Sequence, residues 1–159
     1  VAPMAAAARA GVRFGLGTDG PSSGNTLSLF DQMRLFADAH KTANRDRALF
    51  PAKEIVRAAT RGGAQALHAG NELGQLRPGL RADMVLVSVD APHMFPVYNP
   101  YSALVYGANS SDVSLVMASG EVLVRGGKLT RLDMREAKAR LLEQMGPFMQ
   151  SAAKYADII

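Results

Sequence analysis

Residues 12–20 read VRFGLGTDG, a short and mostly apolar run that ends on an aspartate followed by a glycine. Its length, its apolar centre and the turn residues that bound it predict a β-strand over residues 12–19. Asp19 would then lie at the carboxyl end of the strand, where α/β barrels place catalytic side chains. Gly20 has no Cβ and lets a ligand approach the backbone. Because an Asp-Gly pair after a strand is by itself more typical of a plain turn, the rest of the chain has to decide between the two interpretations.

The composition is that of an ordinary globular protein. The chain has 159 residues, 48% of them hydrophobic and 20% charged, which fits one domain or a piece of a larger one. It contains no run near the roughly 18 apolar residues of a membrane span, and no secretory leader. Because the sequence has no cysteine, any metal must be bound through nitrogen and oxygen. We therefore expect a cytoplasmic protein with no membrane partner.

The charge pattern argues against nucleic-acid binding. The formal net charge is +4, from 18 basic and 14 acidic residues. The basic residues are scattered along the chain, and only 6% of the residues are aromatic. A nucleic-acid surface needs basic side chains gathered in a stripe, with aromatic side chains for the bases. We therefore expect no nucleic-acid partner.

The first 72 residues show helical and strand patterns in the order expected for the closing unit of an α/β layer. Capping residues and glycines set the expected boundaries. The predicted elements are a helix over 1–11, the strand over 12–19, a loop over 20–25, a helix from a cap at Thr26 or Ser28 to about Thr42 with the apolar stripe Leu29, Met33, Phe36 and Ala37, a helix that starts at Pro51 and is broken by Gly62-Gly63, and a further turn over 64–68.

Beyond residue 72 the pattern changes to short β-segments and a closing helix. The predicted elements are a Pro-Gly turn over 76–79, a strand over 84–89, a proline-rich loop over 92–100, a hairpin of 113–117 and 121–125 joined through Ser119-Gly120, and a second glycine turn at 126–127. Asp133 with Glu136 three residues later is typical of a helix start. This helix is expected to bury Met134, Ala137, Leu141, Met145 and Phe148.

Several motifs together resemble a known family. They are GTDG at 17–20, GQLRPGLRADMV at 74–85 and VSLVMASG at 113–120, supported by AATRGGAQAL at 58–67 and MFPVYNP at 94–100. In this order and spacing they closely resemble the C-terminal portion of the amidohydrolase superfamily. The most similar branch is that of the methylthioadenosine/S-adenosylhomocysteine deaminases and the related aminohydrolases and chlorohydrolases of nitrogen heterocycles.

The resemblance implies the C-terminal part of a metal-dependent hydrolase of the α/β class, built on a (β/α)8 TIM barrel with a small β-sandwich. Residues 1–72 would be the end of the barrel, residues 73–132 part of the composite β-sandwich, and residues 133–159 a C-terminal helix and tail. The implied cofactor is a divalent metal, Zn²⁺ in most such enzymes and Fe²⁺ as the alternative. The implied partners are a small heterocyclic substrate and further copies of the same enzyme.

By the same resemblance, Asp19 is the metal-binding aspartate at the end of the last barrel strand, and it takes the proton of the attacking water. A carboxylate suits both tasks, because it is a hard oxygen ligand and a base. Ser23 matches a polar loop residue that supports a neighbouring catalytic histidine in this branch.

The sequence departs from the family in what it lacks. A complete site needs a His-x-His pair, two later histidines and a glutamate, whereas the histidines here are His40, His68 and His93. A (β/α)8 barrel takes about 250 residues. We therefore expect a C-terminal fragment that is inert alone. Without the other strands, Phe14 and Leu16 would be partly uncovered, and the chain would associate.

The histidines and Asp83 also have structural interpretations. We expect His40 and His68 to be exposed at helix ends, where an imidazole interacts favourably with the helix dipole. His93 is expected to be a surface residue of the 92–100 loop, and the alternative is that this loop borders a substrate pocket. Asp83, just before a strand, is expected to cap backbone N–H groups rather than to bind a metal.

Three functional hypotheses follow from the resemblance. The first is a hydrolytic deaminase of adenosine-type thioether nucleosides, supported by residues 94–97 and the loop over 20–25. The second is the same chemistry on another heterocycle, such as 8-oxoguanine, guanine, cytosine or an s-triazine. The third is a non-catalytic interaction module.

Overall fold

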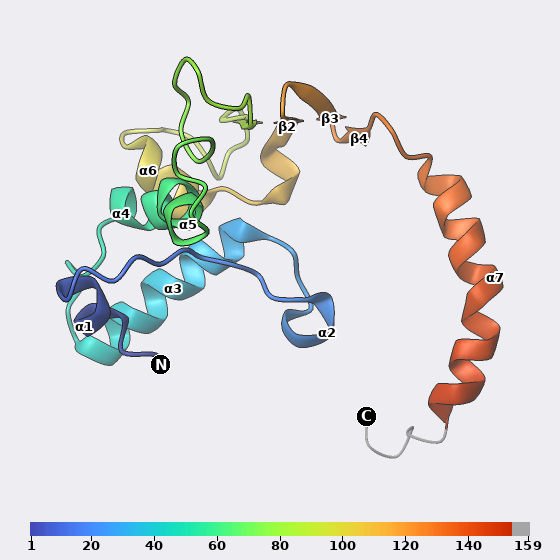
Figure 1. Cartoon of the computed structure of the whole chain (residues 1–159), viewed down its shortest axis with the longest axis horizontal. Helices are drawn as coiled ribbons and strands as arrows, with labels where there is room; N and C mark the ends of the chain where they lie inside the picture. The colour runs from blue at the N-terminus through green and yellow to red at the C-terminus, as the bar shows by residue number, and fades with distance from the viewer. Residues whose placement is uncertain (154–159) are drawn as a thin grey trace.

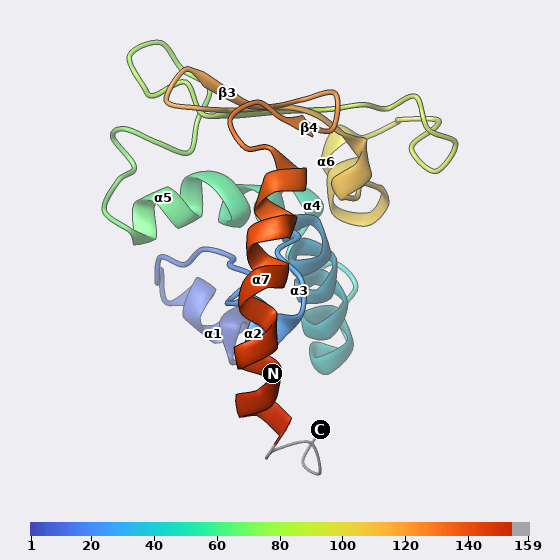
Figure 2. The ribbon, with the colours of Figure 1, turned by 90° about the vertical axis from the view of Figure 1, so that its right-hand side faces the viewer.

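The computed structural model describes residues 1–153 and shows a helical body, an antiparallel sheet beside it, and one long helix that stands apart (Figure 1). The sheet lies across one end of the body, as Figure 2 shows. The body is built from α1 (Met4–Arg9), α2 (Pro21–Gly24), α3 (Leu29–Asn44), α4 (Ala52–Arg57), the π-helix η1 (Ala58–Gly62), α5 (Gly63–Ala66), α6 (Pro100–Ser102) and the π-helix η2 (Ala103–Gly107).

Residues 12–19 run between α1 and α2 without forming a strand (Figure 1). The prediction of a strand here is wrong for the chain as it stands, because no strand among residues 1–153 lies alongside to complete a ladder. The segment instead packs on the helical run over 52–66. Leu16 donates its backbone N–H to the carbonyl of Ala58 at 3.3 Å, a carbonyl that begins the π-helix η1.

Glycines allow this segment to lie directly on the helix backbone. A Cβ on Gly15 would lie 2.5 Å from the Cα of Gly63, and one on Gly62 would lie 2.8 Å from the carbonyl oxygen of Phe14. Real Cβ atoms do not approach other atoms so closely, so these positions need glycine. The expectation that Gly62-Gly63 breaks the helix is therefore wrong. The helix continues through both residues as η1 and α5, and the glycines serve the contact.

The core of the body lies between α3, α4 and η2. Its buried cluster consists of Met33, Ala37, Phe50, Ile55 and Val105, and Phe14 and Leu16 pack partly buried against it. The apolar stripe predicted for α3 is thus confirmed. So is its cap, because Ser28 accepts the backbone N–H of Asp31 on its hydroxyl at 3.3 Å. The expected loop over 20–25 contains one helical turn, α2, which ends at a left-handed Asn25.

The sheet in residues 1–153 has four antiparallel strands in sequence order: β1 (Met84–Val87), β2 (Val113–Ala118), β3 (Glu121–Arg125) and β4 (Lys128–Leu129). The predicted hairpin is confirmed. Its turn has positive φ at both Ser119 and Gly120, the geometry that a tight two-residue hairpin needs. Asp83 accepts the N–H of Ser119 at 2.6 Å, so its predicted capping role is confirmed.

The segment between β1 and β2 joins the sheet to the body. It passes through α6, η2 and the 3-10 turn η3 (Ser110–Asp112). Val105 of η2 is fully buried in the body core, and the guanidinium of Arg34 in α3 donates to the carbonyl of Ala108 at 3.2 Å. The sheet is therefore anchored to the helices through this connection.

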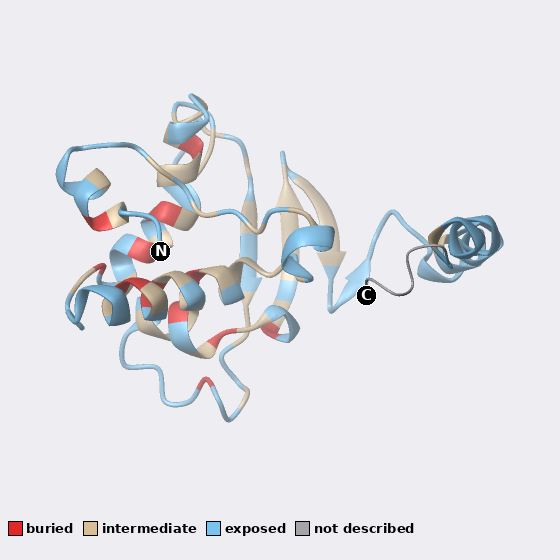
Figure 3. Cartoon of the chain, turned by 90° about the horizontal axis from the view of Figure 1, so that it is seen from below, coloured by how far each residue is buried: buried red, intermediate tan, exposed pale blue. Residues whose placement is uncertain are grey.

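The helix α7 (Met134–Ala152) stands clear of the body (Figure 1, Figure 3). Its predicted cap is confirmed, since Asp133 accepts the N–H of Arg135 at 2.7 Å. Its predicted burial is wrong. No residue of α7 is buried, because no other described element packs against its apolar side chains. Of the predicted C-terminal tail, residues 154–159 lie outside the described residues.

The chain exposes more surface than a folded protein of its mass should. Its accessible surface is 11581 Å², whereas a globular monomer of 16.9 kDa exposes roughly 7,700 Å². Figure 3 shows most of the buried residues in the helical body, with the sheet half covered and α7 exposed. Within residues 1–153 no helix has the length and apolar character needed to cross a bilayer.

Candidate functional site

Asp19 lies at the end of the extended segment, immediately before α2. Its backbone is left-handed, with φ of 58°, a conformation that aspartate tolerates better than most residues. The backbone N–H of Gly20 donates to Oδ1 of Asp19 at 2.7 Å. The hydroxyl of Thr18 donates to the carbonyl oxygen of Asp19 at 3.1 Å. These two bonds hold both the side chain and the backbone of Asp19.

The carboxylate of Asp19 is open to a ligand. The residue is exposed, and among the described residues its Oδ2 accepts no hydrogen bond. A left-handed, hydrogen-bonded aspartate with one free oxygen is preorganised to bind a cation or accept a proton. The structure thus leaves one carboxylate oxygen of Asp19 accessible, and its role as a metal ligand and base stays a prediction.

Ser23 lies on the same turn, in α2. Its backbone N–H donates to the carbonyl of Gly20 at 3.0 Å, and its side chain is exposed. Gly24 packs so close to the segment that a Cβ there would lie 3.0 Å from the carbonyl oxygen of Thr18. The turn thus carries Ser23 and Asp19 on one compact loop at the same end of the extended segment.

The described residues do not complete a metal site. No group of three or more histidine, cysteine, aspartate or glutamate side chains comes together in residues 1–153. The free carboxylate oxygen of Asp19 fits a hard divalent cation as one ligand, but a catalytic zinc needs three protein ligands. A metal bound at Asp19 would need further ligands beyond those that residues 1–153 bring to it.

His40 is a core residue rather than an exposed helix end, so the expected position is wrong. It is 5% exposed, and its ring centroid lies 4.4 Å from that of Phe36 and 5.6 Å from that of Phe50. Burial, followed by the positive charge of the N-terminal amino group, lowers the pKa of His40. The predicted helix already contained His40, but its burial was missed because His40 was not counted with the apolar stripe. It lies seven residues after Met33 and three after Ala37, on the same inward face.

His68 and His93 lie in different places. His68 is exposed in a left-handed conformation just after α5, which confirms the expected helix-end position. His93 donates from Nε2 to Oδ2 of Asp112 at 2.9 Å. Asp112 also accepts the backbone N–H of Asn109 on the same oxygen at 2.9 Å. His93 is therefore more than a surface residue, since it ties the loop over 92–100 to the start of β2.

Asp112 is the one buried carboxylate among the described residues. Its hydrogen bond with His93, and then its bond from the Asn109 N–H, lower the pKa of Asp112. Sequence reasoning missed this residue. A usable signal existed, because asparagine followed three residues later by aspartate is compatible with a capping box, and that box is formed here.

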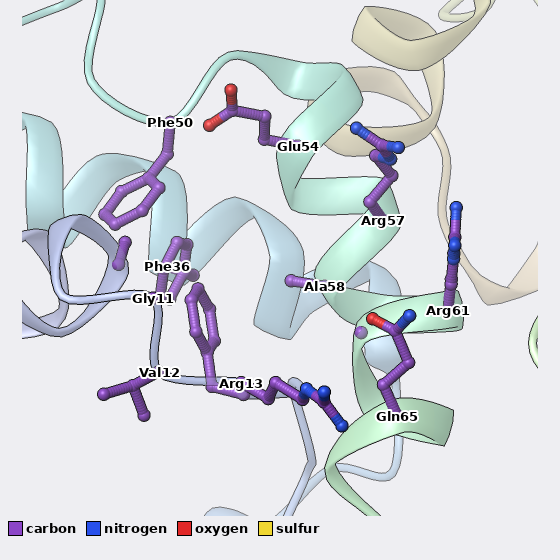
Figure 4. A pocket seen from close by; sticks show the side chains of 13 residues that line it. Gly11, Val12, Arg13, Phe36, Phe50, Glu54, Arg57, Ala58, Arg61 and Gln65 are labelled. Carbon is purple, nitrogen blue, oxygen red and sulfur yellow. The ribbon is translucent and has the colours of Figure 1, made fainter. Parts of the chain in front are cut away.

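Two surface cavities lie away from Asp19. The larger, of about 490 Å³, opens where the start of the extended segment meets α3, α4 and α5 (Figure 4). Arg13, Glu54, Arg57, Arg61 and Gln65 supply its polar lining. The smaller, of about 390 Å³, lies within the loop over 92–100 and includes His93. Asp19 lines neither cavity, so they are not its site.

Comparison with known proteins agrees with the sequence motifs. A sequence model described as "Amidohydrolase family" matches residues 1–123. The 5-methylthioadenosine/S-adenosylhomocysteine deaminase of Nitratidesulfovibrio vulgaris is 40% identical over 152 residues, covering 91% of this chain and 34% of the relative. The enzyme of the same name from Dictyoglomus thermophilum is 41% identical over 147 residues, covering 90% of this chain and 34% of the relative.

Solved structures give the same picture. An adenosine deaminase from Xanthomonas campestris with bound zinc superposes with a TM-score of 0.89 at 31% identity, covering 93% of this chain and 34% of its own. The atrazine chlorohydrolase TrzN from Arthrobacter aurescens TC1, complexed with zinc, gives a TM-score of 0.77 at 33% identity, covering 88% of this chain and 31% of its own. The chain thus spans about a third of the length of the proteins it matches.

Proposed function

This chain belongs to the amidohydrolase family, and from that premise we propose that it supplies the last strand of a (β/α)8 barrel in a hydrolytic deaminase of purine nucleosides. The observation that carries the proposal is the geometry of Asp19, which is held by Gly20 and Thr18 with one carboxylate oxygen free. The relatives named as deaminases support the substrate class. In this proposal residues 1–72 complete the barrel, residues 73–132 belong to the β-sandwich, and residues 133–159 form the C-terminal helix and tail.

We infer that Asp19 supplies one ligand to a divalent metal, zinc in view of the zinc-bound neighbours, with Fe²⁺ as the alternative. Such a metal lowers the pKa of a bound water towards neutrality. The other ligands and the catalytic glutamate would come from residues outside this sequence. The 159 residues alone are therefore expected to show no deamination.

The reaction assigned to this site is a hydrolytic exchange. Water adds to the ring carbon that carries the exocyclic amine, and Asp19 accepts one proton of that water on its free oxygen and passes it to the amine, which leaves as ammonia. The ring carbon becomes a carbonyl, and the second water hydrogen ends on the adjacent ring nitrogen. The Gly20 N–H on Oδ1 keeps the carboxylate oriented while Oδ2 holds the proton. In the same proposal, the hydroxyl of Ser23 supports a neighbouring catalytic histidine of the complete enzyme.

A second candidate is hydrolysis of another nitrogen heterocycle. The likeness to an atrazine chlorohydrolase favours it, because most groups that recognise the substrate would lie outside this sequence. The non-catalytic hypothesis has one observation in its favour, the incomplete ligand set of residues 1–153. For the complete enzyme we also propose that copies of the same chain associate.

A chimera tests the proposal. Residues 1–159 replace the corresponding third of the Dictyoglomus thermophilum deaminase, and the product is assayed for zinc and against methylthioadenosine, adenosine, guanine, cytosine and atrazine. We expect bound zinc and turnover of the adenosine-type substrates. Turnover of guanine, cytosine or atrazine alone would favour the second candidate. A folded chimera without zinc or turnover would contradict the assignment of an enzyme.

A further inference from the structure

Helix α7 presents an unpartnered apolar stripe. The stripe consists of Met134, Leu141, Leu142, Met145, Phe148 and Met149, all of them exposed. At 100° per residue these side chains fall on one face of the helix, and Lys138 is the charged residue that lies among them. Ala139, Glu143 and Gln150 lie on the opposite face, which is polar or small. An amphipathic helix of this kind is stable when its apolar face is packed against another element.

The sequence of α7 makes packing a requirement. Gly146 and Pro147 lie inside the helix. Glycine and proline in a helix interior disfavour the helix, and proline also removes one backbone hydrogen bond. An isolated helix of this length is marginal even with favourable residues. The contact that supports α7 must therefore come from outside the described residues.

The match to the Xanthomonas campestris structure indicates where that contact comes from. The superposition covers 93% of this chain, or about 148 of 159 residues, so it extends past the 133 residues that precede α7. The TM-score over this span is 0.89, and the span includes part of α7. This chain covers only 34% of that longer one, and the remaining two thirds of the longer chain are available to support the helix.

We propose that the apolar stripe of α7 docks on the amino-terminal two thirds of an amidohydrolase barrel and holds that part of the barrel against the helical body. The proposal rests on the proposed function, because it takes residues 1–72 as the closing part of that barrel. The surface exposed beyond that of a compact monomer fits the same partner. The extended segment and the apolar stripe of α7 would both contact this partner.

The partner for the test is the amino-terminal two thirds of the Dictyoglomus thermophilum deaminase, ending where its similarity to this chain begins. It is purified separately and mixed with the 159-residue chain. Light scattering after size exclusion gives the stoichiometry, titration calorimetry gives the affinity, and hydrogen exchange reports on the amides of α7. We expect a 1:1 complex in which the α7 amides exchange at least about tenfold more slowly than in the free chain.

Matched variants separate the stripe from the rest of the helix. Leu141→Asp and Met145→Asp are expected to weaken the association at least about tenfold. Ala139→Asp, on the opposite face of the same helix, should leave it unchanged. Equal binding by all three variants, no complex at all, or self-association of the free chain that the stripe variants abolish would overturn the proposal.

The readout does not depend on catalysis. If the chimera is active but the two purified pieces do not associate, the docking of α7 is contradicted and the proposed function is not. If the two pieces form a tight complex whose affinity depends on the stripe, but the chimera binds no zinc and converts no substrate, the proposed function is contradicted and the docking of α7 is not.

Discussion

Two regions of this chain have the sequence of β-strands, and they differ in where their partners lie. In the hairpin of β2 and β3, Val116 faces Val124 and Met117 faces Val122, so each strand finds its neighbour a few residues away. Residues 12–19 pack against the helical body and have no partner strand among residues 1–153. A β-strand needs a neighbouring strand to hydrogen-bond with, in addition to residues of high β-propensity. The segment over 12–19 therefore stays extended and unpaired. The same holds for the predicted chemistry, since no group of metal-ligating side chains gathers around Asp19 within residues 1–153.

We expect the largest effect from a substitution in the contact between the extended segment and the helical run over 52–66. Gly15→Val places a branched side chain where a Cβ already meets the Cα of Gly63 at 2.5 Å. We expect a loss of about 3 kcal/mol in the free energy of unfolding, because the backbones must separate. Urea unfolding followed by circular dichroism measures it.

Gly17→Val is the control for this change. A Cβ on Gly17 would have no atom within 4 Å, so the variant should change the free energy of unfolding by about 0.5 kcal/mol or less. An equal effect of both substitutions would mean that the segment does not lie against the helix as described.

The hairpin region should be sensitive to a single internal hydrogen bond. Asp83→Ala removes the acceptor for the N–H of Ser119 at the turn. We expect a loss of about 1 kcal/mol in stability, seen as faster hydrogen exchange in β2 and β3 rather than in the helical body. Asp83→Asn keeps an acceptor oxygen and should restore most of the loss, whereas no difference between the two variants would contradict the capping role.

Acid should affect the two regions in different pH windows. Burial lowers the pKa of His40, so its contribution to stability is complete above about pH 6.5 and is lost as the pH falls below that value. The bond with His93 lowers the pKa of Asp112, so its contribution is complete above about pH 3.9 and is lost only in stronger acid.

Urea unfolding as a function of pH checks both windows. His40→Gln should remove the pH dependence of the body that sets in below about pH 6.5. Asp112→Asn should flatten the acid limb of the sheet region below about pH 4. A wild-type stability that stays constant from pH 7 to pH 5 would contradict the buried, neutral His40.

The features that the sequence predicted correctly depend on local chemistry. The caps at Ser28 and Asp133 and the Ser119-Gly120 turn are determined by side chains a few residues apart. The apolar stripe of α3 is buried because the helix period alone defines it. The pairing of residues 12–19 and the covering of α7 depend on chain far away, so local patterns did not reveal that both lack partners here.

The candidate site shows the same difference between features set by neighbouring residues and features that depend on distant ones. Asp19 stays a prediction, because a carboxylate between a strand-like run and a glycine is more typical of a plain turn, and the family motifs along the rest of the chain favour the catalytic interpretation. His40 was misplaced because an imidazole was expected at the exposed helix end, although its spacing from Met33 and Ala37 puts it on the buried face of α3. Asp112 was missed because its importance comes from His93, which is 19 residues away in the sequence and 2.9 Å away in space.

The most direct test of the whole account is the role of Asp19 in the chimera with the Dictyoglomus thermophilum deaminase. Asp19→Asn is compared with Asp38→Asn, an exposed aspartate of α3, by zinc content and by kcat/KM for an adenosine-type substrate. We expect D19N to lose zinc and at least about 100-fold in kcat/KM, and D38N to keep both. Full zinc content and full turnover in the D19N chimera would contradict the claim that this segment ends in the catalytic carboxylate.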